Sequence, residues 1–99
     1  MAKELTLKEI KYIMDNELVN KVFNAIVQLG FGSGTPKNIF YKTELPPREI
    51  KIAIDLLAKL GFLETRRMKQ EGKYYAIDSV KYDYFLRKLK RMEDDEISF

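Results

Sequence analysis

One continuous stretch, residues 45–78, limits what this chain can fold into more than any other part of the sequence. Pro46 and Pro47 stand where a helix can begin, because the first helical turn has no use for the N–H that proline lacks. Apolar and charged residues then alternate at helical spacing, and they fall on two opposite arcs: Ile50, Ala53, Ile54, Leu57 and Leu60 against Arg48, Lys51, Asp55 and Lys59. Gly61 follows, at the usual position of the left-handed residue that ends a helix. The stretch predicts a one-sided helix over 47–60.

Beyond Gly61 the pattern changes from helical to strand-like. Residues 62–68 (FLETRRM) and 73–78 (KYYAID) are rich in aromatic and β-branched types, and the KQEG between them contains Gly72, which can adopt a positive φ in a turn. Basic residues gather around this turn, opposed by two acids: Arg66, Arg67, Lys69 and Lys73 against Glu64 and Glu71. The sequence therefore predicts a β-hairpin with a basic tip.

The helix, the Lys-Leu-Gly-Phe-Leu at 59–63 and the basic hairpin ending in Tyr-Tyr-Ala-Ile at 74–77 resemble the recognition helix and wing of winged helix-turn-helix proteins. The closest resemblance is to the small MarR- and ArsR-type transcription regulators, and the Lys- and Ile-rich, cysteine-free composition is similar to that of archaeal and archaeal-virus regulators. The resemblance is carried by residues 35–78. It implies a mainly α fold with a small β-hairpin wing, an α+β winged helix-turn-helix with extra N- and C-terminal helices.

We expect one domain over residues 1–99, with an N-terminal helix in 1–16, the helix-turn-helix core and wing in 17–78, and a C-terminal helix and acidic tail in 79–99. Ninety-nine residues can bury one modest core and no more. Thr6 and Glu9 fit a capping box at the start of a helix over 7–14. The apolar face then rotates by roughly 100°, which predicts a break near residues 15–16 and a second, broadly apolar scaffold helix over 17–29.

Thr35 and Pro36 form an N-cap and a first helical position, and they predict a short helix over 36–43. A strand is the alternative for this segment, which Pro36 disfavours. Two residues depart from the family pattern, because Phe40 stands where a small residue usually lets the two helices cross and Glu44 stands where a turn glycine is usual. We therefore expect Phe40 to widen the crossing or point elsewhere, and Glu44 to adopt a left-handed backbone or a different turn. The glycine-rich segment 30–37 lacks the spacing of a phosphate-binding loop and is interpreted as a connection.

Ser79 can cap a last helix, and acidic residues at its C-terminal end predict fraying beyond about Met92. The first and last helices carry apolar stripes that a small core has limited room to cover. Pairing across a two-fold axis, as the MarR-type resemblance implies, would place these residues in a homodimer interface: Leu7, Ile10, Tyr82, Phe85, Leu86, Leu89 and Met92. Packing of the last helix within one chain is the alternative and would give a monomer.

The composition argues against catalysis. Histidine and cysteine are both absent, and the carboxylates occur mostly as helix-surface neighbours of cationic residues. We expect no enzyme activity, no cofactor and no metal site. No apolar run approaches membrane-spanning length and the N-terminus lacks the core of a secretory signal, so we expect a cytoplasmic protein with no membrane partner. The formal charge is +3, but four consecutive acids at 93–96 leave residues 1–92 with a charge of +7.

The resemblance assigns DNA-contacting roles to two groups of residues. On the helix, Arg48, Lys51 and Ile52 would face the major groove, with Glu49 at the edge of that face. On the hairpin, Arg66, Arg67, Lys69 and Lys73 would contact phosphates or the minor groove. The chain is thus expected to bind double-stranded DNA sequence-specifically and to regulate transcription, with any small-molecule effector left open. The alternative is a winged helix that serves as a protein-interaction module in a transcription, replication or assembly complex, which Glu49, Asp55, Ile52 and the acidic tail favour.

Overall fold

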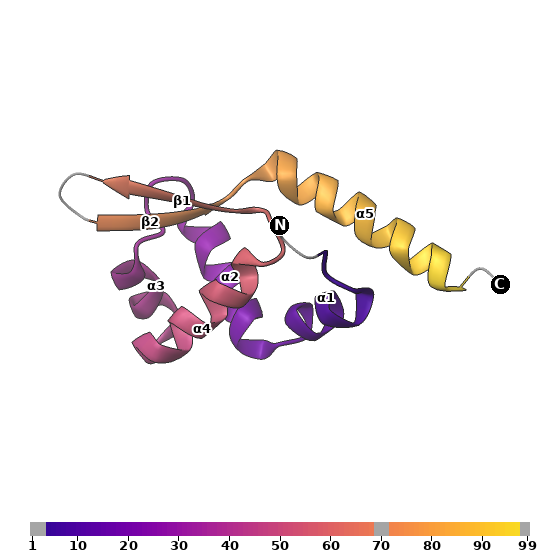
Figure 1. Cartoon of the computed structure of the whole chain (residues 1–99). Coiled ribbons are helices and arrows are strands. Elements are labelled where there is room, and N and C mark those ends of the chain that lie inside the picture. The colour runs from indigo at the N-terminus through magenta and orange to yellow at the C-terminus, as the bar shows by residue number, and fades with distance from the viewer. Residues whose placement is uncertain (1–3, 69–71, 98–99) are drawn as a thin grey trace.

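The computed structural model of the chain describes residues 4–68 and 72–97, which form helices around a single hairpin. The elements, in order, are α1 (Leu7–Met14), α2 (Glu17–Leu29), α3 (Pro36–Thr43), α4 (Pro47–Ala58), β1 (Leu63–Met68), β2 (Gly72–Ile77) and α5 (Ser79–Ile97). Figure 1 shows α2, α3 and α4 gathered under the hairpin, whereas α5 runs away from it above α1. The described fold is therefore mainly helical with a small two-stranded antiparallel sheet, as the sequence predicts.

Each of the first two helices begins at a capping side chain, and the second of these caps lies at the break between them. The Thr6 hydroxyl accepts a hydrogen bond from the N–H of Glu9, and the Glu9 carboxylate accepts one from the N–H of Thr6, which completes the predicted capping box. Asn16 then caps α2, because its Oδ1 accepts from the N–H groups of Leu18 at 2.9 Å and Val19 at 3.2 Å. Both predicted boundaries are confirmed.

Helix α3 begins as predicted and ends in a strained turn. The Thr35 hydroxyl accepts from the N–H of Asn38 at 3.2 Å, so the strand alternative for this segment is wrong. Glu44 takes the left-handed conformation, with φ 59° and ψ 18°, and its N–H donates to the Phe40 carbonyl at 2.7 Å. The Thr43 hydroxyl supports this turn by accepting from the N–H of Leu45 at 3.3 Å. The Phe40 side chain points outward, 40% exposed, instead of entering the crossing of the two helices.

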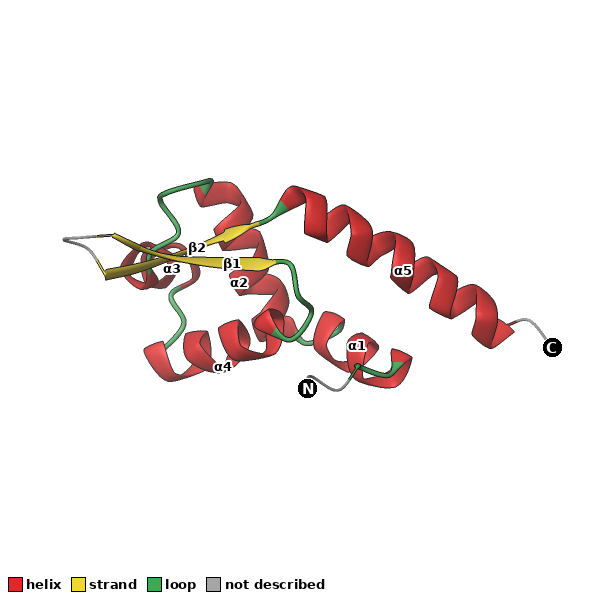
Figure 2. Ribbon diagram, turned by 45° about the horizontal axis from the view of Figure 1, so that its top comes forward, coloured by secondary structure: helices red, strands yellow, loops and turns green. Residues whose placement is uncertain are grey.

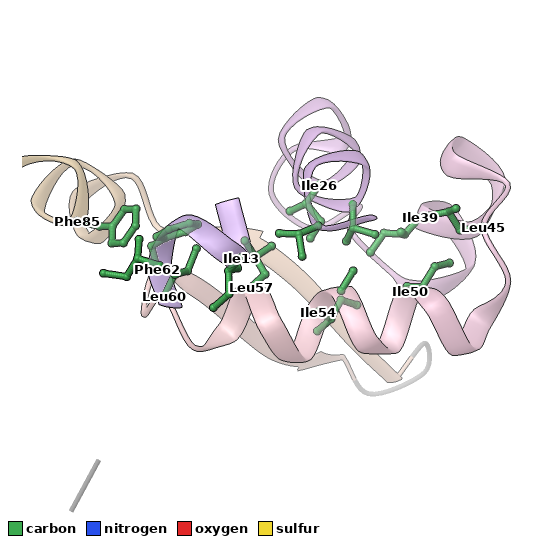
Figure 3. Close-up of a cluster of buried hydrophobic side chains, with 14 of the residues drawn as sticks. Ile13, Ile26, Ile39, Leu45, Ile50, Ile54, Leu57, Leu60, Phe62 and Phe85 are labelled. Atoms are coloured by element: carbon green, nitrogen blue, oxygen red, sulfur yellow. The ribbon is translucent and has the colours of Figure 1, made fainter. Parts of the chain in front are cut away.

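The core lies between α2 and α4. All five residues of the predicted apolar arc are buried, and α2 buries Val19, Val22, Ala25 and Ile26 against α4. The predicted helix over 47–60 is slightly too long, because α4 ends at Ala58 and Leu60 lies in the turn that leads to Gly61. Figure 3 shows Ile50, Ile54 and Leu57 of α4 pointing toward Ile26 and Ile39. The prediction that α2 is the buried scaffold helix is confirmed. With α4 held in this way, its opposite face is directed to solvent (Figure 2).

The hairpin is anchored to the helices by the loop that follows α2. Strands β1 and β2 pair in an antiparallel register that sets Thr65 opposite Tyr75 and Arg67 opposite Lys73. On the other side of β2, the N–H of Tyr75 donates to the carbonyl of Gly34 at 2.8 Å. The loop therefore continues the backbone hydrogen bonding across the free edge of β2 and holds the hairpin over α3 and α4.

Two predictions about the last helix need correction. Its cap is Asp78 rather than Ser79, because the Asp78 carboxylate accepts from the N–H groups of Val80 at 3.0 Å and Lys81 at 3.1 Å. The helix also continues to Ile97 instead of fraying after Met92. The unfavourable interaction of acids with the helix dipole is worth only about 0.3–1 kcal/mol, and it does not outweigh the backbone hydrogen bonds of the final turn here. No helix in the described ranges is both long and apolar enough to cross a membrane.

Candidate functional site

The outward face of α4 carries the residues that the sequence assigned to it. Arg48 and Lys51 are exposed, and Ile52, a large apolar side chain, is 47% exposed. Glu49 is half-buried at the side of this face, and Asp55 is exposed one turn further along the helix. Because the opposite arc is fixed in the core, these side chains have one common direction, toward solvent. Ile52 is therefore an apolar contact point among charges.

Two hairpin cations lie directly opposite each other. Arg67 on β1 and Lys73 on β2 are register partners, and both side chains are exposed. Opposed residues of an antiparallel pair project from the same face of the sheet, so the two positive charges repel at close range. The folded protein gains no stability from this pair of cations. The pair is therefore a candidate binding site for an external anion. Lys69, the third cation of the predicted hairpin site, lies outside the described residues.

Arg66 is held differently from Arg67. Its Nε donates to Glu64 Oε1 at 2.7 Å, and its guanidinium carbon lies 5.1 Å from the centroid of the Phe31 ring. The hydrogen bond and the charge of Glu64 both raise the pKa of Arg66. Its register partner is Tyr74, so Arg66 projects from the hairpin face opposite to that of Arg67. The structure thus separates two neighbouring arginines that the sequence grouped together.

A groove lies between α3, α4 and β2, and cations from all three elements line it. We call it the lysine groove. It has a volume of about 520 Å³, its charged lining residues are Lys37, Lys51, Lys73 and Asp55, and its apolar ones are Pro36, Phe40, Pro47, Ile50, Ile54 and Tyr75. The ion pairs of the described residues, Arg66 with Glu64, Arg87 with Asp83 and Lys88 with Glu4, involve none of these three lysines. The groove thus combines an apolar floor with three lysines and one carboxylate, Asp55, so its lining residues carry a net positive charge.

Lys37 is a member of this site that the sequence interpretation missed. It occupies the first turn of α3 and shares a helix face with Phe40, three residues later. Residues three apart on a helix share a face. An exposed Phe40 therefore implies that Lys37 lies beside it on the surface of α3. This inference requires knowing which face of α3 is buried. Because Ile39 alone of that helix is buried, the sequence pattern of α3 does not define that face clearly.

Tyr75 forms part of the groove and is chemically distinct from the other aromatic residues. Partial burial of its phenol, and secondarily the negative charge of Asp55, raise the pKa of Tyr75. Like an ordinary tyrosine, whose pKa is about 10, the phenol is protonated at neutral pH and can donate a hydrogen bond to an acceptor in the groove. Among the residues that the structure describes, no cluster of three or more acidic, histidine or cysteine side chains could hold a metal ion.

The residues predicted for a dimer interface are largely covered within one chain. Ile10, Phe85 and Leu89 are buried in the core cluster, and Leu7, Tyr82 and Met92 are partly buried against it. Leu86 alone of this set is classed as exposed, at 38%. The reason is that α5 packs against α1, and Lys88 Nζ also lies 3.2 Å from Glu4 Oε1. This corrects the expectation that the apolar stripes of the first and last helices are left uncovered within one chain. A two-fold pairing of the terminal helices stays a prediction and would have to use their remaining exposed surface.

Comparison of the chain with models of protein families, with curated proteins and with solved structures finds no match. What the site can do must therefore be argued from its own geometry. That geometry is an exposed helix face, a groove beside it with three lysines, and a pair of opposed cations on the adjacent hairpin.

Proposed function

We propose that the chain is a winged-helix protein that binds double-stranded DNA sequence-specifically and regulates transcription. One observation carries this proposal: cations from three separate elements, Lys37, Lys51 and Lys73, line one groove beside the exposed face of α4. Like charges brought together by folding raise the energy of the free protein, so their convergence is best explained by a polyanion that binds them. In this reading β1 and β2 form the wing, and the expected protein is a cytoplasmic homodimer of the MarR or ArsR kind.

In this proposal α4 is the recognition helix, which contacts the DNA bases. The major groove admits an α-helix, and the residues at its N-terminal end reach the base edges. Arg48 has two guanidinium N–H groups suited to guanine, Glu49 can accept from the amino group of cytosine, and Ile52 can contact a thymine methyl. The exposure of Arg48 and Ile52, and the position of Glu49 at the edge of the face, support these roles.

The hairpin and α3 supply the sequence-independent part of the binding. Arg67, Lys73 and Lys37 would neutralise phosphates on either side of α4, which fixes its orientation without reading bases. Arg66 contributes less in this proposal, because Glu64 already neutralises it and its face is opposite. Two copies related by a two-fold axis would place their reading helices in successive major grooves, about one helical turn apart.

The second candidate function is a protein-interaction module, and one feature favours it. The floor of the lysine groove is apolar, and Asp55 lies within it. Phosphates need cations but not an apolar floor, and a carboxylate repels them. A protein segment with apolar and charged residues would use all of these features.

A fluorescence-anisotropy titration separates the two functions. The purified protein is titrated against a labelled random-sequence duplex at low and moderate salt. DNA binding predicts micromolar affinity that falls steeply with salt, and a smaller slope for the variant K51Q/K73Q. The matched control K11Q/K21Q removes the same charge from exposed lysines of α1 and α2 that do not line the groove, and it should leave the slope closer to that of the wild type. Absence of binding at low salt would reject the DNA function, and equal slopes for the two variants would reject the site.

A further inference from the structure

The apolar floor of the lysine groove needs an occupant that DNA backbone does not provide. Phe40, Ile50 and Ile54 line the floor, while three lysines and one carboxylate, Asp55, surround it, so the lysines outnumber the single acid. Phe40 is 40% exposed although it is a large apolar side chain. A ligand that matches this surface must carry several negative charges and at least one apolar side chain within a short span.

The C-terminal end of the chain has this chemistry. Glu93, Asp94 and Asp95 lie in the last turns of α5, where Asp94 and Asp95 are exposed, and none of the three enters an ion pair of the described residues. In the sequence Glu96 completes four consecutive acids, and Ile97, Ser98 and Phe99 follow. Acids near the C-terminal end of a helix oppose the helix dipole, so their presence there costs stability that another interaction can offset.

The acidic segment points away from the groove of its own chain. Figures 1 and 2 both show α5 running from the base of the hairpin to the opposite end of the molecule, whereas α3 and α4 lie on the hairpin side. The molecule measures 53 Å along its longest axis and 24 Å along its shortest. To reach its own groove, the segment would have to unfold much of α5 and expose Phe85 and Leu89, which are buried in the core.

From this complementarity of charge and shape, we propose that the lysine groove of one copy binds the acidic C-terminal segment, residues 93–99, of a second copy. The four acids pair with Lys37, Lys51 and Lys73, and an apolar residue that follows the acids contacts the floor at Phe40, Ile50 and Ile54. The contact is weak and strongly salt-dependent, because the lysines and acids stay partly exposed. If each of two copies binds the other's segment, they form a closed dimer. If each copy binds the segment of one neighbour and offers its own segment to another, an open-ended polymer forms.

The proposal has a regulatory consequence that rests on the proposed DNA function. The segment occupies the groove that would contact phosphates, so self-association and DNA binding exclude each other. Neutralising the acids should therefore tighten binding to a random duplex at low salt. The self-association itself does not depend on DNA, and it is tested without it.

The first test measures binding of the segment itself. The probe is a fluorescein-labelled peptide of residues 92–99, and the receptor is the full chain carrying E93Q/D94N/D95N/E96Q, whose own segment no longer competes. We expect saturable binding that weakens at least tenfold when K37E/K51E/K73E is added. The matched control K11E/K21E/K90E changes the net charge by the same amount at exposed positions outside the groove and should weaken binding much less. No binding of the peptide, or equal losses in both variants, would overturn the proposal.

The second test guards against a variant that misfolds. Sedimentation velocity should show concentration-dependent association of the wild-type chain at low salt, lost in E93Q/D94N/D95N/E96Q. A chain with E93K/D94K/D95K/E96K should associate with K37E/K51E/K73E when the two are mixed, and neither should associate alone. Recovery only in the mixture is the result expected if the acids meet these lysines. A wild-type chain that stays monomeric, or a mixture that does not associate while both variants keep cooperative thermal unfolding, contradicts the proposal.

Discussion

Gly34 lies against the backbone of Tyr75 with no room for a side chain between them. The N–H of Tyr75 donates to the carbonyl oxygen of Gly34 at 2.8 Å, and a Cβ on Gly34 would overlap the carbonyl oxygen of Tyr75. Tyr75 and Lys73 both line the lysine groove, so this contact ties the strand that forms one side of the groove to the loop that precedes α3. A glycine in a loop thereby helps to shape the candidate site.

The first prediction concerns this contact. Gly34→Ala should destabilise the fold by about 1–3 kcal/mol, the usual cost of forcing an extra group into a packed position. The obstructing atoms belong to the backbone of β2 and cannot rotate away. Urea unfolding followed by circular dichroism measures the loss. Ser33→Ala is the control, because Ser33 is exposed and its hydrogen bonds to the described residues use only its backbone: its N–H donates to the Gly30 carbonyl and its own carbonyl accepts from Asn38. This substitution should change stability by less than about 0.5 kcal/mol. Equal stability of the two variants would show that the loop can move away from β2.

The second prediction uses the contrast between two adjacent arginines. Arg67→Ala should reduce the salt slope of binding to a random duplex by about 0.9, the value for one lost phosphate contact. It should leave the stability of the free protein unchanged or slightly higher, because it relieves the repulsion between Arg67 and Lys73. Anisotropy titrations at several salt concentrations give the slope, and thermal unfolding gives the stability.

Arg66→Ala is the matched comparison for this measurement. Arg66 is already paired with Glu64 and stacks over Phe31, so its removal should change the slope much less than removal of Arg67. A larger effect for Arg66 than for Arg67 would mean that DNA approaches the opposite face of the hairpin, and the proposed orientation would then be wrong.

The third prediction is a pH dependence of stability. The pKa of Tyr75 is raised by burial and by Asp55, so the unfolded chain loses the phenol proton at lower pH than the folded chain does. The stabilisation is complete below the ordinary tyrosine pKa of about 10, and it is lost as the pH rises through the higher pKa of the folded state. Tyr75→Phe removes this term, so its loss of stability above pH ~10 should be smaller than that of the wild type.

Lysines also titrate in this range, so the informative quantity is the difference between variants. The free energy of unfolding is measured in urea below and above pH ~10 for the wild type, Tyr75→Phe and Tyr12→Phe. Tyr12 is 68% exposed and serves as the control for deleting one phenol. Parallel pH profiles for the wild type and Tyr75→Phe would show that the environment of the phenol does not favour its protonated form.

The helices could be predicted from the sequence because local signals define their ends. Thr6 with Glu9, Asn16 and Thr35 each bond to backbone N–H groups within three residues, so their effect does not depend on the rest of the fold. Asp78 instead of Ser79 as the last cap was missed because both residue types suit that position. The cover of Phe85 and Leu89 within one chain was left open, because a helical stripe shows that a face is buried and not which surface buries it.

The candidate site was only partly predictable for a related reason. The exposed residues of α4 follow from its periodicity, but the grouping of Lys37 with Lys51 and Lys73 depends on how α3 packs. The separation of Arg66 from Arg67 follows from strand alternation. The aromatic ring that Arg66 lies over, however, is Phe31, on a loop more than thirty residues away in the sequence. Contacts between distant segments are what a single sequence does not reveal.

The last prediction tests whether α4 reads bases. Arg48 is exposed at the second residue of the helix and takes part in no ion pair of the described residues, so its guanidinium is available to a guanine. A preferred site is first selected from a random pool of duplexes with the wild-type protein. Arg48→Ala should then lose about 1–3 kcal/mol on that site and much less on random duplex, since a phosphate contact would be lost on both. Arg91→Ala, an exposed arginine of α5, should lose little on either. Equal losses of Arg48→Ala on the two duplexes would mean that this residue contacts phosphate, and that any sequence preference comes from Ile52, from Glu49 or from the shape of the DNA.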